Sequence, residues 1–225
     1  MIAEATAGLN SIRIRFGAAG LAIAGVLFVM YPAIRPFSDE TTLEGAAAFA
    51  SSSWLVAHVL AMIGFILISL AAGALWLALS ASRAERVAFR AAVATAVGVG
   101  LSLPFYGGEA FGLHAIGTAA LREQSTTILA ISGDVRGGAA LVIFLAGLTV
   151  LGLGAVGLAI AAWRSGVLGK WSGVPFAVGF GLFIPQFFWA QPLRVAHGAL
   201  IALGCFWIAS ELWRVTGAGA RRRDR

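Results

Sequence analysis

Three histidines and one glutamate are the residues of this sequence with the widest choice of chemistry. His58, His114 and His197 are its only histidines, and Glu109 lies five residues before His114. Histidine is a usual axial ligand of haem iron, so two facing histidines could hold a haem. Three histidines with a carboxylate could instead hold a zinc ion that activates water. Without a metal, His58, Glu109 and His197 could form a proton-coupled or ligand-recognition site.

Other polar and aromatic residues near the same ends of apolar segments are expected to border this site. They are Trp54, Tyr106, Gln186, Gln191 and Arg194. No haem-attachment CxxCH, zinc-binding HExxH or nucleophile-bearing GxSxG motif is present, and Cys205 is the single cysteine. A GxGxxG match at residues 152–157 lies inside an apolar run with no strand before it, so it does not indicate a dinucleotide site. Haem is therefore the favoured cofactor candidate and zinc the second. Both choices rest on the residue types present and not on a catalytic motif.

Composition excludes an ordinary soluble protein. Hydrophobic residues make up 60% of the 225 residues and charged residues 12%, against about 45–50% and about 25% in soluble domains. Apolar runs of 18 or more residues recur, and each is long enough to cross a bilayer. The basic cluster at residues 221–225 is short and lacks aromatic neighbours, so the net charge of +6 does not indicate nucleic-acid binding. The sequence predicts a polytopic membrane protein.

The predicted fold is an all-α bundle of six transmembrane helices in one domain of residues 1–225. The expected spans cover residues 16–34, 53–79, 91–106, 138–163, 171–190 and 193–213. With a cytoplasmic N-terminus, twelve of the sixteen Lys and Arg residues fall inside, and the other four are Arg35, Arg122, Arg136 and Arg194. Basic residues favour cytoplasmic loops, so both termini are expected inside. Abundant Arg, Ala and Gly are typical of GC-rich bacteria, which favours a bacterial inner membrane.

Two segments on the outer side are too long to be turns. Residues 41–44, Thr-Thr-Leu-Glu, read as a capping box that opens a short helix. Residues 107–137 are too polar to span a membrane and too long for an unstructured loop. We expect one or two short helices on the outer face there, in a position suited to a lid.

Depth and helical phase connect two of the histidines. His58 and His197 lie at nearly the same distance from the outer ends of their spans. Arg194, His197 and Ile201 share one helix face, and a polar stripe in lipid turns toward the bundle interior. We therefore expect His58 and His197 to face inward and converge, with Glu109 or His114 at the same cavity.

A purely structural interpretation stands beside this one. His58 and His197 could each simply hydrogen-bond a backbone carbonyl or hydroxyl on the next helix, and His114 could be solvated. Glu109 could pair with Arg122 or Arg194. Glu211 is expected to pair with Arg214 three residues on. Tryptophans near span ends, Trp54 among them, are typical aromatic-belt anchors.

Small residues predict where helices approach closely. Gly173, Ala177 and Gly181 recur every four residues, and Gly147, Gly154 and Ala161 every seven. Such repeats let neighbouring backbones pack in a membrane.

Four motifs carry a resemblance to a family. They are Trp54-x-x-x-His58, the run Gly-Glu-Ala-Phe-Gly-Leu-His at 108–114, Trp-Arg-Ser-Gly at 163–166, and Arg-Val-Ala-His-Gly at 194–198. In order and position they resemble uncharacterised six-span bacterial integral membrane proteins over most of the chain. The resemblance implies six spans and no activity.

Function is therefore expected in one of three classes. The first is a membrane protein whose outward-opening polar pocket binds a small apolar or amphipathic ligand or a metal cofactor. The second is a membrane-embedded metal-dependent enzyme acting on a lipid or other amphiphile. The third is a structural subunit that assembles with itself or with another membrane protein.

Overall fold

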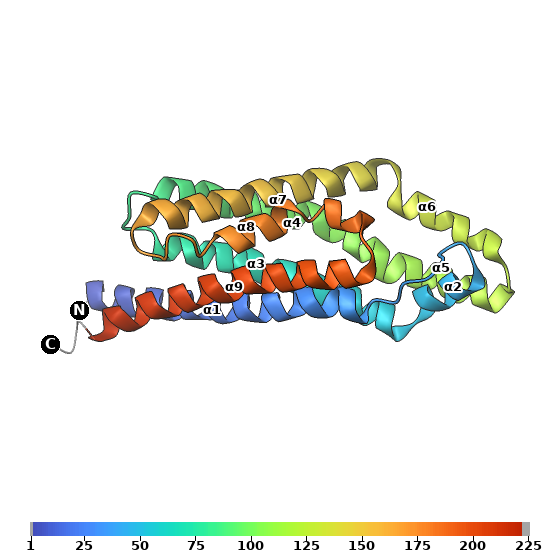
Figure 1. The fold of residues 1–225 in the computed structure, drawn as a ribbon, viewed down its shortest axis with the longest axis horizontal. Helices are drawn as coiled ribbons and strands as arrows, with labels where there is room; N and C mark the ends of the chain where they lie inside the picture. Colours follow the sequence, from blue (N-terminus) through green and yellow to red (C-terminus); the bar gives the residue numbers. More distant parts are fainter. Residues whose placement is uncertain (1, 222–225) are drawn as a thin grey trace.

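The computed structural model describes residues 2–221 and is helical throughout, with no strand in that part of the chain. Five of its helical stretches are long and apolar enough to cross a membrane: Gly8–Ile34, Ser52–Ala78, Glu85–Glu123, Gly138–Ser165 and Gln191–Gly217. Figure 1 shows them running roughly parallel to the long axis of the molecule. The prediction of an all-α, multi-pass membrane protein is confirmed at this level. Residues 222–225 of the basic C-terminal cluster lie outside the described residues.

The long helices are joined by short ones. In chain order they are α1 (Ile2–Ile34), α2 (Leu43–Ala50), α3 (Ser52–Ala78), α4 (Glu85–Gly107), the π-helical turn η1 (Gly108–Gly112), α5 (Leu113–Glu123), the 3-10 helix η2 (Thr126–Ala130), α6 (Ile131–Arg136), α7 (Gly138–Ser165), α8 (Val174–Gly181), the 3-10 helix η3 (Pro185–Phe188) and α9 (Gln191–Arg221). The predicted third span, 91–106, is only the middle of a helix that continues from Glu85 to Glu123.

The predicted fifth span, 171–190, is not a continuous helix. Its helix α8 has eight residues, and a turn follows before η3 begins at Pro185, which has no N–H to donate. At one end of this segment the backbone N of Gly169 donates to the carboxylate of Glu211 over 2.9 Å. At the other end the side chain of Gln191 donates to the carbonyl of Pro32 over 3.2 Å. The segment therefore runs beside α9 in a broken form that hydropathy alone could not reveal.

Glycines bring α4 and α7 into close contact. A Cβ on Gly98 would lie 2.4 Å from the backbone N of Leu151, and one on Gly154 would lie 2.6 Å from the hydroxyl of Thr95. A Cβ on Gly147 would lie 2.7 Å from the hydroxyl of Ser102. The predicted small-residue face of α7 therefore packs against α4, as such faces do where backbones approach.

The second predicted small-residue face, Gly173, Ala177 and Gly181, lies on the segment around α8 and packs closely at only part of its length. A Cβ on Gly173 would lie 2.6 Å from the Cα of Ala159 in α7, but nothing lies within 4 Å of one on Gly181. The backbone around Gly181 still lies near α7, because a Cβ on Gly152 would lie 3.9 Å from the Cα of Gly181. Helix α8 contacts α9 at two other glycines. A Cβ on Gly179 would lie 2.6 Å from Ile201 of α9, and a Cβ on Gly204 of α9 would lie against Phe176 of α8.

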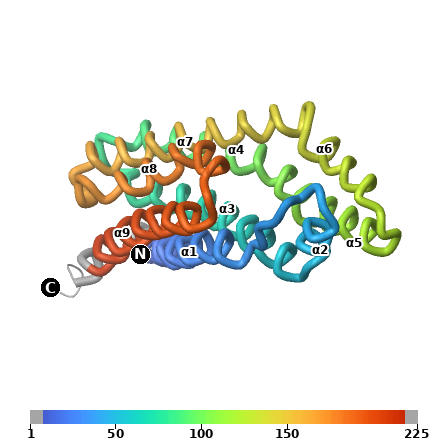
Figure 2. The backbone as a smooth tube through the Cα atoms, turned by 45° about the vertical axis from the view of Figure 1, so that its right-hand side comes forward, coloured from blue at the N-terminus to red at the C-terminus, as the bar shows by residue number. Residues whose placement is uncertain are grey.

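One end of the bundle carries an extension, called the cap here, made of α2, α5, η2 and α6. Figure 1 and Figure 2 show α5 continuing beyond the other long helices in the direction of α4, with α2 beside it. The cap has its own small core, separate from that of the bundle: Ala46, Phe49, Trp54, Leu113, Ala120 and Leu129. The short helix expected after residue 41 is present, with Thr42 as N-cap accepting from the backbone N of Gly45. The helices between residues 107 and 137 thus exist, but the first of them extends a long helix instead of lying flat across the bundle.

Candidate functional site

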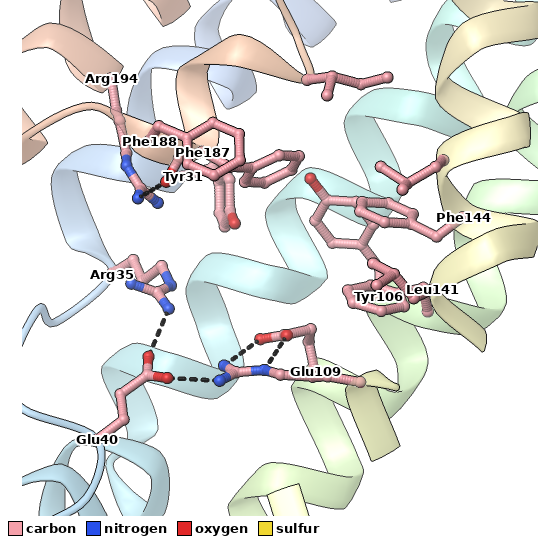
Figure 3. Close-up of a pocket in the computed structure, with 14 residues that line it drawn as sticks. Tyr31, Arg35, Glu40, Tyr106, Glu109, Leu141, Phe144, Phe187, Phe188 and Arg194 are labelled. Atoms are coloured by element: carbon pink, nitrogen blue, oxygen red, sulfur yellow. Dashed lines mark hydrogen bonds and ion pairs between the residues drawn. The ribbon is translucent and has the colours of Figure 1, made fainter. Parts of the chain in front are cut away.

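A cavity of about 460 Å³ lies where the bundle meets the cap. Figure 3 shows its two kinds of wall. Aromatic and aliphatic side chains from α4, α7 and the segment around η3 form one wall: Phe105, Leu141, Phe144, Leu145, Ile184, Phe187 and Phe188. Polar side chains from α1, the loop after it, α4, η1, α6 and α9 form the other: Tyr31, Arg35, Glu40, Tyr106, Glu109, Arg136 and Arg194. Such a mixed lining suits an amphipathic ligand.

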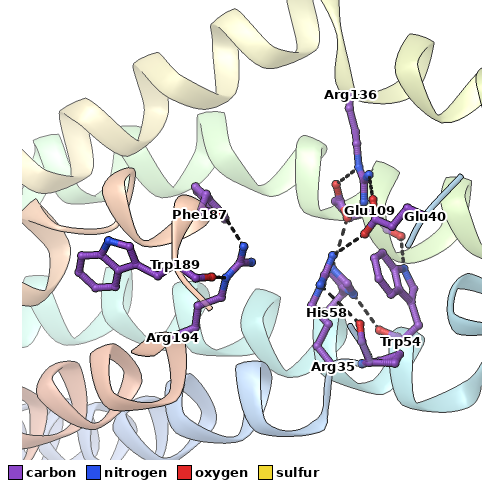
Figure 4. A network of polar contacts seen from close by, with 10 residues as sticks. Arg35, Glu40, Trp54, His58, Glu109, Arg136, Phe187, Trp189 and Arg194 are labelled. Carbon is purple, nitrogen blue, oxygen red and sulfur yellow. Dashed lines mark hydrogen bonds and ion pairs between the residues drawn. The ribbon is translucent and has the colours of Figure 1, made fainter. Parts of the chain in front are cut away.

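Glu109 is the centre of an ion-pair network beside this cavity. Arg136 holds its carboxylate with two hydrogen bonds, from Nε over 2.5 Å and from Nη2 over 3.0 Å. Arg136 also donates to Glu40, which accepts in turn from Arg35 over 3.0 Å. Figure 4 shows this chain of contacts. It ties α6, the loop after α1 and η1 together.

The two carboxylates keep Arg136 charged. Burial alone would lower the pKa of Arg136, but its hydrogen bonds to Glu109 and Glu40 outweigh burial and raise that pKa above its ordinary value. Bidentate pairing of this kind is strong and fixes orientation as well as charge. The sequence marks Arg136 only as one of four outer basic residues, and the structural interpretation pairs Glu109 with Arg122 or Arg194. That pairing is wrong, because the return of α6 toward α4 places Arg136 there instead.

His58 extends the network into the bundle. Its Nδ1 lies 2.8 Å from the carbonyl oxygen of Trp54, and its Nε2 lies 3.5 Å from the carboxylate of Glu109. Both ring nitrogens thus face oxygen atoms of the protein. The side chain is 1% exposed. His58 is therefore occupied by protein groups on both sides.

Trp54, near the start of α3, supports the same network through a hydrogen bond and a ring contact. It is fully buried, so it is not a membrane-interface anchor as its sequence position suggested. Its Nε1 donates to the backbone carbonyl of Glu109 over 2.7 Å, and the guanidinium of Arg35 lies 4.4 Å from its ring centre. Trp54 thus fixes the backbone at η1, where Glu109 projects.

Arg194 is the cation of the cavity that no carboxylate of the described residues pairs with. Its Nε donates to the carbonyl of Trp189 over 2.8 Å, and its Nη2 donates to the carbonyl of Phe187 over 2.5 Å. These bonds hold the guanidinium at the cavity wall (Figure 3). The lining therefore carries three arginines against two carboxylates, an excess of positive charge.

Two tyrosines complete the polar wall. The rings of Tyr31 and Tyr106 lie 5.9 Å apart, and both are buried. The hydroxyl of Tyr106 is buried without a hydrogen-bond partner in the part of the chain that the structure describes. The hydroxyl is enclosed by protein and not open to the cavity, and the polar group beside it is the hydroxyl of Tyr31.

The other predicted ligands lie elsewhere. The Nδ1 of His114 lies 3.0 Å from the carbonyl of Phe49 in α2, and the Nε2 of His197 lies 2.7 Å from the carbonyl of Gly179 in α8. Neither histidine lines the cavity. His58 does not line the cavity either, so the structure does not bring His58 and His197 to that cavity together. Only His197 binds as the structural interpretation predicts, to a carbonyl of another helix, because His58 binds a carbonyl of its own helix α3 and His114, expected in solvent, binds α2.

The metal interpretations lack their ligands. No group of three or more His, Cys, Asp or Glu side chains able to hold a metal ion occurs among the described residues. The two histidines proposed as haem ligands are held by separate elements, His58 between Trp54 and Glu109 and His197 against α8. Of the remaining predicted residues, Gln186 is buried beside His197 and Gln191 ties α9 to α1.

Comparison with protein-family models, curated proteins and solved structures gives no match for this chain.

Proposed function

We propose that this membrane protein binds an amphiphile with an acidic head group in the cavity between bundle and cap. The observation that carries the proposal is Arg194, a partly buried guanidinium without a carboxylate partner among the described residues, at the edge of a largely apolar cavity. A cation in such surroundings favours an anion that restores neutrality. The apolar wall would take the hydrocarbon part of the same molecule.

Charge and hydrogen-bonding capacity support a head group with one negative charge. Arg35 and Arg136 already share Glu40, and Arg136 also holds Glu109. One arginine therefore remains to be neutralised. The Nη1 of Arg194 makes no hydrogen bond among the described residues, so it provides a donor for such a head group.

The rim of the cavity supports access from the bilayer. Leu141 of α7 is 41% exposed and Phe188 of η3 is 87% exposed, and both line the cavity. An apolar rim next to a membrane-spanning helix would face lipid chains. The ligand would thus enter sideways, which suits a molecule already dissolved in the membrane.

We propose six membrane crossings for this protein, with the broken segment of α8 and η3 as the fifth. The contacts of Gly169 with Glu211 and of Gln191 with Pro32 support it, because they lie near opposite ends of α9. Both termini would then be cytoplasmic, the cap would lie outside, and the protein would reside in a bacterial inner membrane, as the distribution of basic residues favours.

The cavity proposal is tested by measuring ligand binding to the purified protein in micelles. The probes are a long-chain fatty acid and the alcohol of the same chain, titrated onto wild type, Arg194→Gln and the control Arg122→Gln. A hydrogen-bonded charge pair is worth about 1.5–3 kcal/mol, so Arg194→Gln should weaken fatty-acid binding by roughly tenfold to a hundredfold. Arg122 lies away from the cavity and is 74% exposed, so its variant should bind as wild type does.

Two outcomes would contradict the proposal. Equal affinity for acid and alcohol would remove the role of Arg194, and absence of binding by both would remove the cavity as an amphiphile site. The structural-subunit interpretation would then lead, and recovery of a stable complex of several chains would support it.

A further inference from the structure

A second apolar hollow lies near the opposite end of the bundle from the cap, between α7 and α8. It has a volume of about 570 Å³ and opens onto the outer surface of the bundle. Its wall is formed by Val156, Ala159, Ile160, Trp163, Arg164 and Val174. Val156 and Ile160 are 42% and 44% exposed, so the groove presents aliphatic side chains where lipid surrounds the helices.

Aromatic and basic side chains gather at one end of this groove. The rings of Trp163 and Trp171 pack edge to face with centres 4.2 Å apart. The Nζ of Lys170 lies 4.3 Å from the ring centre of Trp163. Arg83 donates from its Nε to the backbone carbonyl of Arg164 over 2.7 Å, which brings another guanidinium to the same place.

The three cations make no ion pair with a carboxylate in the part of the chain that the structure describes. Two acidic residues at this end have other partners: Glu211 binds Arg214 and the backbone of Gly169, and Glu85 accepts from Trp76. Tryptophan at the head-group level with basic residues beside it is the pattern that binds anionic lipid head groups. The apolar groove therefore matches the acyl chains of a phospholipid, the tryptophan pair matches its interfacial region, and the cations match its phosphate.

We propose that this groove is a binding site for an anionic phospholipid, with one acyl chain against Val156 and Ile160. Arg164, Lys170 and Arg83 hold the phosphate head group. The site is separate from the cavity at the cap and does not depend on its function. A second copy of the chain is a poorer occupant, because a twofold contact would place these cations against the same cations of the partner.

Thermal unfolding in micelles tests the proposal, with phosphatidylglycerol and phosphatidylcholine of identical chains as probes. Lipid that binds the folded protein raises its melting temperature with concentration, which gives an apparent affinity for each lipid. Arg164 and Lys170 together should contribute a preference of roughly thirtyfold for the anionic lipid. The double variant Arg164→Gln, Lys170→Gln should lower the preference by that factor, with Arg83 still in place, whereas Arg194→Gln, at the other site, should leave it unchanged.

A second variant tests the apolar half. Ile160→Trp fills the groove without changing charge and should weaken binding of both lipids while circular dichroism reports an unchanged helix content. Equal affinity for the two lipids in wild type, or an unchanged preference in the double variant, would overturn the proposal. Native mass spectrometry that finds two chains and no retained lipid would overturn it as well, in favour of a protein interface.

Discussion

Replacing Glu109 by Gln removes the charge at the centre of the network that joins bundle and cap. Arg136 makes two hydrogen bonds to this carboxylate and one to Glu40, and the side chains of Glu109 and Arg136 are only 11% and 26% exposed. Breaking a buried ion pair by removing one partner costs about 3–5 kcal/mol. Because Arg136 keeps Glu40, we expect a value near the lower end, about 3 kcal/mol.

The pair is measured by a double-mutant cycle of Glu109→Gln and Arg136→Gln, with unfolding followed in micelles titrated with sodium dodecyl sulfate. The two groups share hydrogen bonds, so their coupling should be at least about 1.5 kcal/mol. The matched control is Arg122 with Glu123, an Arg–Glu pair whose side chains are 74% and 54% exposed. Its coupling should stay below about 0.5 kcal/mol. Equal coupling in the two pairs would refute the reasoning that burial makes the Glu109 pair strong.

Four further substitutions have expected outcomes in the same unfolding assay. Gly98→Ala should lower the free energy of unfolding by about 1–3 kcal/mol because its Cβ would meet the α7 backbone. Gly100→Ala, with no atom within 4 Å of the new Cβ, should raise the free energy of unfolding by about 0.5–1 kcal/mol. Similar values for the two variants would contradict the packing argument. Trp54→Phe should cost about 1–3 kcal/mol, since it leaves a buried carbonyl without its donor, and an unchanged midpoint would show that this bond contributes nothing. Tyr106→Phe should leave stability unchanged or slightly raised because its enclosed hydroxyl has no partner with good hydrogen-bond geometry among the described residues; a destabilised variant would show that the neighbouring hydroxyl of Tyr31 is its partner.

Interactions between near neighbours in the chain were predictable from the sequence. Glu211 pairs with Arg214, three residues on, as expected, because helical spacing alone brings the two side chains together. The short helix after residue 41 and the inward face of α9 at Ile201 also follow from local pattern. Hydropathy likewise located the long helices, and most of the predicted ends lie within a few residues of the observed ones.

Contacts that depend on how helices pack were not predictable in this way. The partner of Glu109 comes from α6, 27 residues further on, and its arrival depends on the turn at Gly137 and on α5 extending past the bundle. The predicted span at 171–190 is apolar enough to cross a membrane, but the turn before Pro185 interrupts it. His58 and His197 share a depth along their helices, yet the neighbours of each ring are set by different elements.

Photo-crosslinking of a bound amphiphile tests the central claim most directly. A fatty acid with a photoreactive group in its chain is irradiated with the purified protein, and labelled peptides are identified by mass spectrometry. We expect label on residues 141–145 of α7 and 184–188 around η3, reduced by excess fatty acid and by Arg194→Gln. Label spread evenly over exposed lipid-facing positions such as Leu70 and Leu153, each 65% exposed, and unaffected by competitor, would contradict the claim that the cavity is an amphiphile site.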